Sequence, residues 1–449
     1  MDKEYLIRQN PMRAMWVLAF PMIIGNLFQQ FYNMVDSVIV GRFVGEDALA
    51  AVGASYALTY VFISIATGGG IGASVLTGRA FGRRDYDRMK RSISTALFSF
   101  LGLSIALGTF GLLFSGKIMA WLQTPENIMD DAQTYLNIYF AGLPFLFMYN
   151  VLASMFNALG RSRIPLYLLI FSSVLNVILD IYMVRVLGLG VAGVAWATLI
   201  AQGVSALTSF TLFLRELKTY PSHQALACFD VEELKSMVRI AAPSIFQQST
   251  VSIGLMLVQS AVNGFGSEML AGYSAGTRIE SICLVPMLAM GNAMSAYTAQ
   301  NIGAGEFERV KQGYRTAIQI IGGFAILLCV ITVPFANPII SLFLEEEGTQ
   351  LALQTGVARC QFIGWFYFIA GLKMTTDGLL RGSGDMTMFT VANLANLGLR
   401  VSFTLIMTPI FGIAMTWVAV PLGWSINFIV SYCEFRTGKW RKKNEKNQK

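Results

Sequence analysis

Residues 29–45 read QQFYNMVDSVIVGRFVG and place one acid, Asp36, inside an otherwise apolar run. The sequence from Met12 to Val40 is mostly Ala, Ile, Leu, Met, Phe and Val. A charged carboxylate without a partner costs several kcal/mol in such surroundings. Asp36 is therefore a candidate for binding a proton, a cation or a buried polar partner.

The composition requires a membrane around such runs. The chain has 449 residues, of which 55% are hydrophobic and 13% charged, against about 25% charged in a soluble domain. Each apolar run can cross a hydrocarbon core of ~30 Å as a helix. The first run is predicted to be a retained span, because it lacks the cleavage site of a signal peptide. The runs cover residues 13–40, 47–77, 92–114, 134–157, 164–187, 189–214, 237–265, 269–299, 314–340, 351–375, 386–408 and 410–433.

The net charge of +7 orients the protein in its membrane. With a cytoplasmic N-terminus, Lys and Arg collect in the inner segments and in the tail 437–449, while the outer loops collect acids such as those at 345–347. This is the positive-inside pattern, so both termini are expected in the cytoplasm of a multi-pass protein of the cell (inner) membrane. The basic excess then needs no nucleic acid to explain it.

The chain lacks the residue clusters of a metalloprotein or an enzyme. The single histidine, His223, lies in a polar linker, and the five cysteines are far apart in the sequence. They predict no disulfide framework and no metal site. We expect a protein that is not an enzyme and that has no cofactor apart from a coupling ion. The cysteines are Cys228, Cys283, Cys329, Cys360 and Cys433.

The sequence repeats itself once, at a constant offset. VGEDALAAVGAS at 44–55 resembles FGSEMLAGYSAG at 265–276, and Trp196 and Trp417 share this offset. Six spans in each repeat make the repeats parallel, which implies a pseudo-two-fold axis along the membrane normal. The predicted fold is therefore an all-α integral membrane protein of twelve transmembrane helices in two six-helix lobes, an arrangement that favours a transporter.

Four segments follow from the repeat. The predicted parts are an N-lobe of spans 1–6 at 1–217, a cytoplasmic linker at 218–236, a C-lobe of spans 7–12 at 237–436, and a basic cytoplasmic tail at 437–449.

Carboxylates within the spans are the strongest candidate functional residues. Asn176 and Asp180 are four residues apart and share a helix face, as do Asn33 and Asp36. If the first six spans form a bundle, Asp36 and Asp180 can meet in a dry pocket and exchange a proton near neutral pH, or bind Na⁺ through carboxylate and amide oxygens. A purely structural pairing is the alternative. Further hydroxyl groups for this site are expected from Tyr32, Tyr135, Tyr139 and Thr198.

The C-terminal half carries two more acids within its spans. Glu280 could attract a cationic substrate, or hold a structural partner. Asp377 is expected to form an ion pair with Arg381, four residues further on. The aromatic and methionine content suits a pocket for flat hydrophobic cations, and the cluster TGGGIGAS at 67–74 predicts close helix packing.

Several of these motifs together resemble the multidrug and toxic compound extrusion (MATE) family. They are FPMIIGNLFQQFYNMVDSVIVGRFVG at 20–45, GRAFGRRD at 78–85, NxxxD at 176–180, RIE at 278–280 and LLRGSGD at 379–385. The likeness covers nearly the whole chain. It implies two six-helix lobes, a cavity open alternately to each side, and export of small-molecule organic cations in exchange for H⁺ or Na⁺.

The resemblance also implies roles for individual residues. Asp36 matches the acid of the first span, Asn176 and Asp180 match the fifth-span pair of the N-lobe cation site, and Glu280 matches an acid implicated in drug binding. Pro21 matches a proline at which the first helix is proposed to bend. Asp36, Asn176 and Asp180 would be metal ligands only if Na⁺ is the coupling ion.

One branch of the family also uses acids of the C-lobe for Na⁺. Here the corresponding positions fall near Gln259 and Ala370, so the coupling ion is expected in the N-lobe, which favours H⁺.

Other functions stay open at this point. A lipid or lipid-linked oligosaccharide flippase of the same superfamily would need cationic side chains in its spans, and the chain has Arg278, Arg359, Lys373 and Arg400. An ion channel is less favoured, because no selectivity loop is apparent. The protein is expected to work as a monomer in the lipid bilayer.

Overall fold

A computed structural model describes residues 3–121, 124–221, 229–344 and 349–446, and this part of the chain is helical with no strand. The predicted all-α class is therefore confirmed. His223, Cys228 and the acids at 345–347, together with the middle of the predicted linker and the last three residues of the tail, lie outside the described residues.

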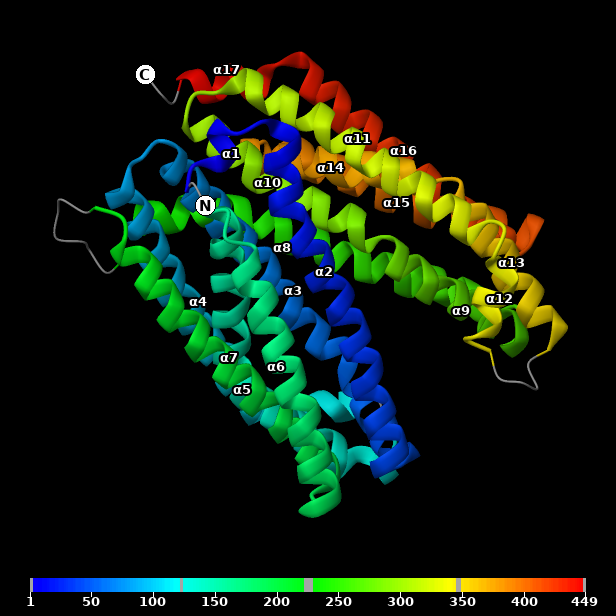
Figure 1. Ribbon diagram of the computed structural model, residues 1–449. Helices are drawn as coiled ribbons and strands as arrows, with labels where there is room; N and C mark the ends of the chain where they lie inside the picture. The colour runs from blue at the N-terminus through cyan, green and yellow to red at the C-terminus, as the bar shows by residue number, and fades with distance from the viewer. Residues whose placement is uncertain (1–2, 122–123, 222–228, 345–348, 447–449) are drawn as a thin grey trace. The chain divides into compact units, whose positions relative to one another are not determined.

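The helices follow the apolar runs of the sequence (Figure 1). Two short segments, η1 and η2, are π-helices that continue α2 and α6. The first half contains α1 (Tyr5–Arg8), α2 (Pro11–Ile39), η1 (Val40–Val44), α3 (Glu46–Gly82), α4 (Tyr86–Trp121), α5 (Glu126–Ala158), α6 (Arg163–Ile181), η2 (Tyr182–Val186) and α7 (Gly190–Lys218). The second half contains α8 (Val231–Asn263), α9 (Ser267–Cys283), α10 (Val285–Gly303), α11 (Phe307–Thr332), α12 (Ala336–Ser341), α13 (Gln350–Gly364), α14 (Tyr367–Ser383), α15 (Met386–Phe411), α16 (Ala414–Thr437) and α17 (Lys439–Lys446).

Eleven of the twelve predicted spans coincide with described helical segments that are long and apolar enough to cross a membrane, and one of these, Ser267–Gly303, consists of α9 and α10 with an interruption at Leu284. The remaining one, predicted at 351–375, is divided into α13 of 15 residues and α14 of 17 residues. Each piece is shorter than the ~20 residues that a full crossing needs. The tenth span is therefore a broken helix, interrupted at Trp365 and Phe366.

The chain forms two compact units. The N-unit is Ile24–Ile245, and the C-unit is Met1–Ile23 with Phe246–Lys449. The chain thus passes from one unit to the other inside α2 and inside α8. In each case a proline, Pro21 or Pro243, lies two residues before the crossing. The segment boundaries drawn from the sequence repeat describe the duplication and stay a prediction.

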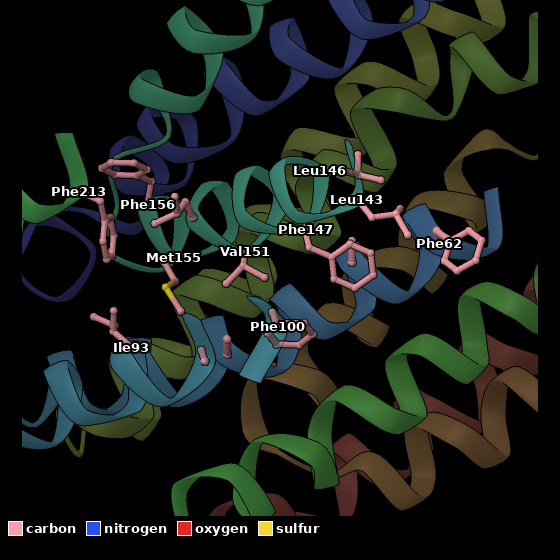
Figure 2. Packing of buried hydrophobic residues seen from close by; sticks show 14 of the residues in the cluster. Phe62, Ile93, Phe100, Leu143, Leu146, Phe147, Val151, Met155, Phe156 and Phe213 are labelled. Atoms are coloured by element: carbon pink, nitrogen blue, oxygen red, sulfur yellow. The ribbon is translucent and has the colours of Figure 1, made fainter. Parts of the chain in front are cut away.

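The N-unit is built around α5, which packs on α3, α4 and α7. Its core is a continuous set of buried aromatic and aliphatic side chains (Figure 2). Phe156 of α5 and Phe213 of α7 meet edge to face with ring centroids 4.9 Å apart, and Phe62 of α3 meets Phe140 in the same way at 5.5 Å. Such pairs each stabilise a core by about 0.5–1.5 kcal/mol beyond their buried area.

Small residues bring helices of the N-unit close together, as predicted for the cluster at 67–74. A Cβ atom on Gly72 would lie 2.7 Å from the Cβ of Ala241, and one on Gly68 would lie 2.8 Å from the backbone of Ile245. The first part of α8 therefore packs directly on the α3 backbone. In the C-unit, Gly378 of α14 plays the same part against the carbonyl of Gly291 on α10.

Unusual backbone angles recur at equivalent positions of the two halves. Gly45 and Gly266 are separated by the same offset as the repeated motifs, both have positive φ (123° and 93°), and each immediately precedes a helix, α3 or α9. Arg84 and Gly305 share this offset and also have positive φ (58° and 80°). Equivalent turns at equivalent positions support the duplication that the sequence motifs predict.

Candidate functional site

The structure brings Asp36 of α2 and Asp180 of α6 together within the N-unit. Asp180 is fully buried and Asp36 is half-buried. Their carboxyl groups lie within hydrogen-bonding reach of each other. The two acids are far apart in the sequence, and the packing of α6 beside α2 makes them neighbours.

Asn176 holds the pair in place from the same face of α6. It is 2% exposed, and with its amide nitrogen toward Asp180 it donates to Oδ2 of Asp180 at 3.0 Å, while its oxygen accepts from the backbone N–H of Thr198 at 3.1 Å. A hydrogen bond of 2.6 Å joins its side chain to the hydroxyl of Tyr32. Three helices, α2, α6 and α7, therefore meet at this one amide.

The carboxyl pair has capacity for a further ligand. Oδ1 of Asp36 and Oδ1 of Asp180 are buried and make no hydrogen bond to any described residue. Two adjacent carboxylates repel each other unless a proton or a cation lies between them. The oxygens of Asp36 and Asp180 are also the hard donors that Na⁺ takes, whereas the oxygen of Asn176, which accepts from Thr198, would join them only after the amide turned over. The donor set thus fits either a proton or Na⁺.

The other residues predicted for this site lie at different distances from it. Tyr135 is close enough to interact electrostatically with both acids. Tyr135, Tyr139 and Thr198 line one small pocket, which offers about the space that one water molecule needs; its lining does not include Asp36 or Asp180. The Tyr139 hydroxyl donates to the backbone oxygen of Thr59 at 3.2 Å. Asn33 is exposed and accepts a hydrogen bond from Gln29, outside the cluster.

Each acid is followed closely by a π-helical segment. η1 begins four residues after Asp36, and η2 begins two residues after Asp180. η1 and η2 contact each other, and the guanidinium of Arg185 lies 4.6 Å from the ring centroid of Phe43. π-helical turns inside α-helices are frequent at functional sites. In the described part of the second half, α8 and α15 continue without such segments.

Glu280 lies in the C-unit and is buried beside Arg359 of α13. The Arg359 guanidinium donates to Oε2 of Glu280, and it stacks 4.4 Å from the ring centroid of Tyr273. The structural partner that the sequence left open for Glu280 is therefore Arg359. Its role as a substrate contact stays a prediction.

The expected ion pair between Asp377 and Arg381 is wrong. Asp377 pairs instead with Lys373, one turn earlier on α14, at 2.9 Å, and it accepts from Asn393 at 3.3 Å. Arg381 donates to Oδ1 of Asn292 at 3.0 Å. Both lysine and arginine are four residues from Asp377, and the neighbouring helices decide which of them turns toward it.

Sequence reasoning missed the π-helical segments and the partner of Glu280. Arg359 is recognisable in the sequence as a cation within a span, but it lies far from Glu280 along the chain. Its position on α13, directly opposite the glycine-rich face of α9, emerges only from the packing of these two helices.

Known proteins resemble this chain along its whole length. A sequence profile of the MatE family matches residues 21–182 and 243–406. The probable multidrug resistance protein YoeA of Bacillus subtilis (strain 168) is 30% identical over 447 residues, covering 96% of this chain and 94% of YoeA. A Shewanella oneidensis protein named FAD transporter is 26% identical over 353 residues, or 76% of each chain.

Solved structures share the fold. The outward-facing structure of a multidrug resistance MATE family transporter of the MOP superfamily superposes with a TM-score of 0.91 at 24% identity, over 98% of this chain and 99% of that one. The profile matches each half of the chain once, in agreement with the repeat, and the 30% identity to YoeA agrees with the family that the motifs resemble. This chain is a multi-pass membrane protein and belongs to the MATE family of transporters.

Proposed function

We propose that this protein is a secondary active exporter of hydrophobic organic cations, which it exchanges for H⁺ or Na⁺ by alternating access. The observation that carries the proposal is the buried carboxyl pair of Asp36 and Asp180, with two oxygens that lack a partner among the described residues. The name of YoeA, a multidrug resistance protein, supports drugs as the substrate class.

The acid pair would act as the coupling site. On the outer side, Asp36 or Asp180 takes up a proton or Na⁺, and the pocket closes into a form that disfavours the drug. Loss of the ion on the inner side restores the drug-binding form. A coupling ion must prefer one state of the protein, and this preference acts reciprocally on drug affinity. Asn176 and Tyr32 would keep the pair aligned, and Tyr135 and Thr198 would complete the ion's surroundings.

Pro21 would serve as the hinge of the first span. Proline removes a backbone donor and permits a helix to bend. Pro21 lies inside α2, two residues before the chain passes from the C-unit to the N-unit. A bend at this point would move the half of α2 that carries Asp36 while the other half stays with the C-unit.

The coupling ion that the sequence favours is H⁺. The C-lobe positions used for Na⁺ in one branch of the family fall near Gln259 and Ala370, which carry no charge. Na⁺ remains the second candidate, held by Asp36 and Asp180, with the oxygen of Asn176 joining them once its amide turns away from Thr198. We further propose a monomer in the cell membrane, with both termini in the cytoplasm as the positive-inside pattern requires.

Glu280 is the proposed contact for cationic drugs. Because Arg359 already pairs with it, a drug would have to displace this arginine. A flippase for lipids or lipid-linked oligosaccharides is the second candidate function, favoured by the buried Arg359 and by Arg400. The relative named FAD transporter also supports substrates that carry phosphate.

Efflux of ethidium from proteoliposomes tests the proposal. Vesicles that hold the purified protein are given a pH gradient and, separately, a sodium gradient. Ion-driven ethidium movement against its gradient is expected under the pH gradient. Ethidium movement that ignores both gradients would contradict antiport, and a lack of ethidium movement combined with transfer of fluorescent lipid would favour the flippase.

A further inference from the structure

A second group of buried charges lies in the C-unit, and its excess is positive. Arg359 of α13 and Arg400 of α15 lie near one acid, Glu280 of α9. The neighbouring Tyr273 and Tyr367 bring hydroxyl groups. The two arginines therefore share one carboxylate, which leaves one positive charge without a counter-ion among these groups.

Arg359 is 1% exposed and is only partly satisfied. Its Nη2 donates to Glu280, while its Nε and Nη1 make no hydrogen bond to any residue that the structure describes. A buried donor without an acceptor costs about 1–3 kcal/mol, and more when it is charged. The guanidinium is thus held in position with N–H groups that remain available to an acceptor.

Arg400 adds a second incomplete cation at the same place. It lies close enough to Glu280, Tyr273 and Arg359 to interact electrostatically with all three. Its Nε is buried and has no hydrogen-bond partner in the described part of the chain. The positive charges of Arg359 and Arg400 repel each other, and an anion that reaches both would stabilise both.

The packing of α9 leaves space for this arrangement. A Cβ atom on Gly276 would lie 2.8 Å from the Cδ of Arg359 and 3.2 Å from its Nε. Glycine at this position allows the Arg359 side chain to lie flat across α9, between Glu280 and the ring of Tyr273. The Arg359 side chain therefore lies between α13 and the backbone of α9.

A one-residue shift of the repeat pairs an acid of the first half with an arginine of the second. NVILD at 176–180 aligns with NLGLR at 396–400, at an offset one short of that between the other repeated motifs. Asn176 corresponds to Asn396, and Asp180 corresponds to Arg400. The helix position that carries an acid for a proton or cation in the first half carries a guanidinium in the second.

We propose that Arg359 and Arg400 form a binding site for the phosphate or carboxylate group of an anionic amphiphile. When no ligand is bound, the carboxylate of Glu280 occupies this site and competes with the ligand. A planar guanidinium presents paired N–H donors that match a carboxylate or phosphate. The aromatic ring of Tyr273 beside them suits a ligand with a flat apolar part. This site goes beyond the proposed export of cations and does not depend on it.

Binding of flavin mononucleotide to the purified protein in detergent tests the site. Flavin mononucleotide carries a phosphate on a flat fluorescent ring system, and riboflavin is the same molecule without the phosphate. Fluorescence titration without any ion gradient is expected to show at least tenfold tighter binding of the mononucleotide. Equal affinities for the two flavins would overturn the proposal.

Three variants locate the binding. Arg400→Gln leaves the pair of Glu280 and Arg359 intact and is expected to weaken mononucleotide binding about tenfold or more. Glu280→Gln removes the competing carboxylate and is expected to tighten it. Arg315→Gln, which changes an exposed arginine on α11, is the matched control and should change nothing.

The sign of the Glu280→Gln effect separates this proposal from the cation site. Weaker mononucleotide binding in Glu280→Gln, or unchanged binding in Arg400→Gln, overturns the anion site even if ethidium export works. Arg400→Lys keeps the charge without the planar fork, so partial binding in this variant supports the site if Arg400→Gln fails to fold. Competition by phosphatidylglycerol, but not by phosphatidylcholine, would identify a lipid headgroup as the source of the anion, whereas mononucleotide binding without such competition points to a soluble ligand.

Discussion

A hydrogen bond of 2.6 Å joins the side chains of Tyr32 on α2 and Asn176 on α6. Asn176 also reaches Asp180 on its own helix and Thr198 on α7. Any change in the charge of the acid pair therefore acts directly on the contact that ties α2 to the rest of the N-unit.

Tyr32→Phe should weaken this tie without removing the ring. Loss of one hydrogen bond lowers the free energy of unfolding by about 1 kcal/mol. Thermal unfolding in detergent measures the change. Tyr56→Phe is the control, because the Tyr56 side chain is 65% exposed. Equal unfolding temperatures for Tyr32→Phe and the wild type would show that the bond does not stabilise the protein.

Asp180→Asn should abolish ion-driven efflux while the protein still inserts into the membrane. The amide preserves the size of the side chain but cannot exchange a proton, so the proposed coupling step is lost. Ethidium efflux from proteoliposomes measures the effect. Asp130→Asn, which changes an exposed acid near the start of α5, should transport normally. Normal drug export by well-expressed Asp180→Asn would count against the coupling site.

The start of α8 should loosen in acid. Oδ1 of Asp230 accepts from the backbone N–H groups of Glu232 at 2.9 Å and Glu233 at 3.2 Å. These bonds, first that to Glu233, and the nearby Arg91 lower the pKa of Asp230 below its usual range. A lowered pKa in the folded state means stability that is present above about pH 4 and lost as the pH falls through the folded pKa.

Hydrogen exchange of the first turn of α8 checks this cap. Asp230→Ala should exchange faster than the wild type at pH 7, and the difference should shrink once the wild-type acid is protonated. Asp230→Asn keeps an acceptor oxygen without the charge and should lie between the two. A difference between the wild type and Asp230→Ala that is independent of pH would rule out the carboxylate as the source.

Gly378→Ala should strongly disturb the contact of α10 with α14. A Cβ atom there would collide with the carbonyl of Gly291, and overpacking of this kind costs about 1–3 kcal/mol. Gly398→Ala is the matched control, because a Cβ on Gly398 meets nothing within 4 Å among the described residues. The unfolding temperature should fall only in the first variant. A similar fall in both would indicate a backbone effect of glycine and not a close contact.

The prediction of the fold from sequence succeeded where the signal was local. Apolar runs of sufficient length locate membrane helices one at a time, and eleven of the twelve predicted spans coincide with described helical segments. The break between α13 and α14 was not predicted, because the run at 351–375 stays apolar through Trp365 and Phe366. Hydropathy reports how well a segment dissolves in lipid, and it does not detect a short turn whose own residues are apolar.

Local spacing in the sequence predicted only part of the candidate site. Asn176 and Asp180 share a face because helical spacing places them there. Asn33 lies outside the cluster, and Asp377 pairs with Lys373 and not with Arg381. Both outcomes depend on which neighbouring helix the side chain faces. Lys373 and Arg381 are both four residues from Asp377, and the local preference for an acid that precedes its base favours Arg381; the pair with Lys373 therefore reflects the packing of neighbouring helices.

The sequence alone determined that the protein lies in a membrane, where its helices run, that it is duplicated, and which acids are costly in their apolar surroundings. Each of these depends on the composition or spacing of neighbouring residues. Only the tertiary structure decided which distant charges meet, as Asp36 with Asp180 and Glu280 with Arg359. Charges buried among packed helices take the partner that the packing brings within reach, and the packing is a property of the whole chain.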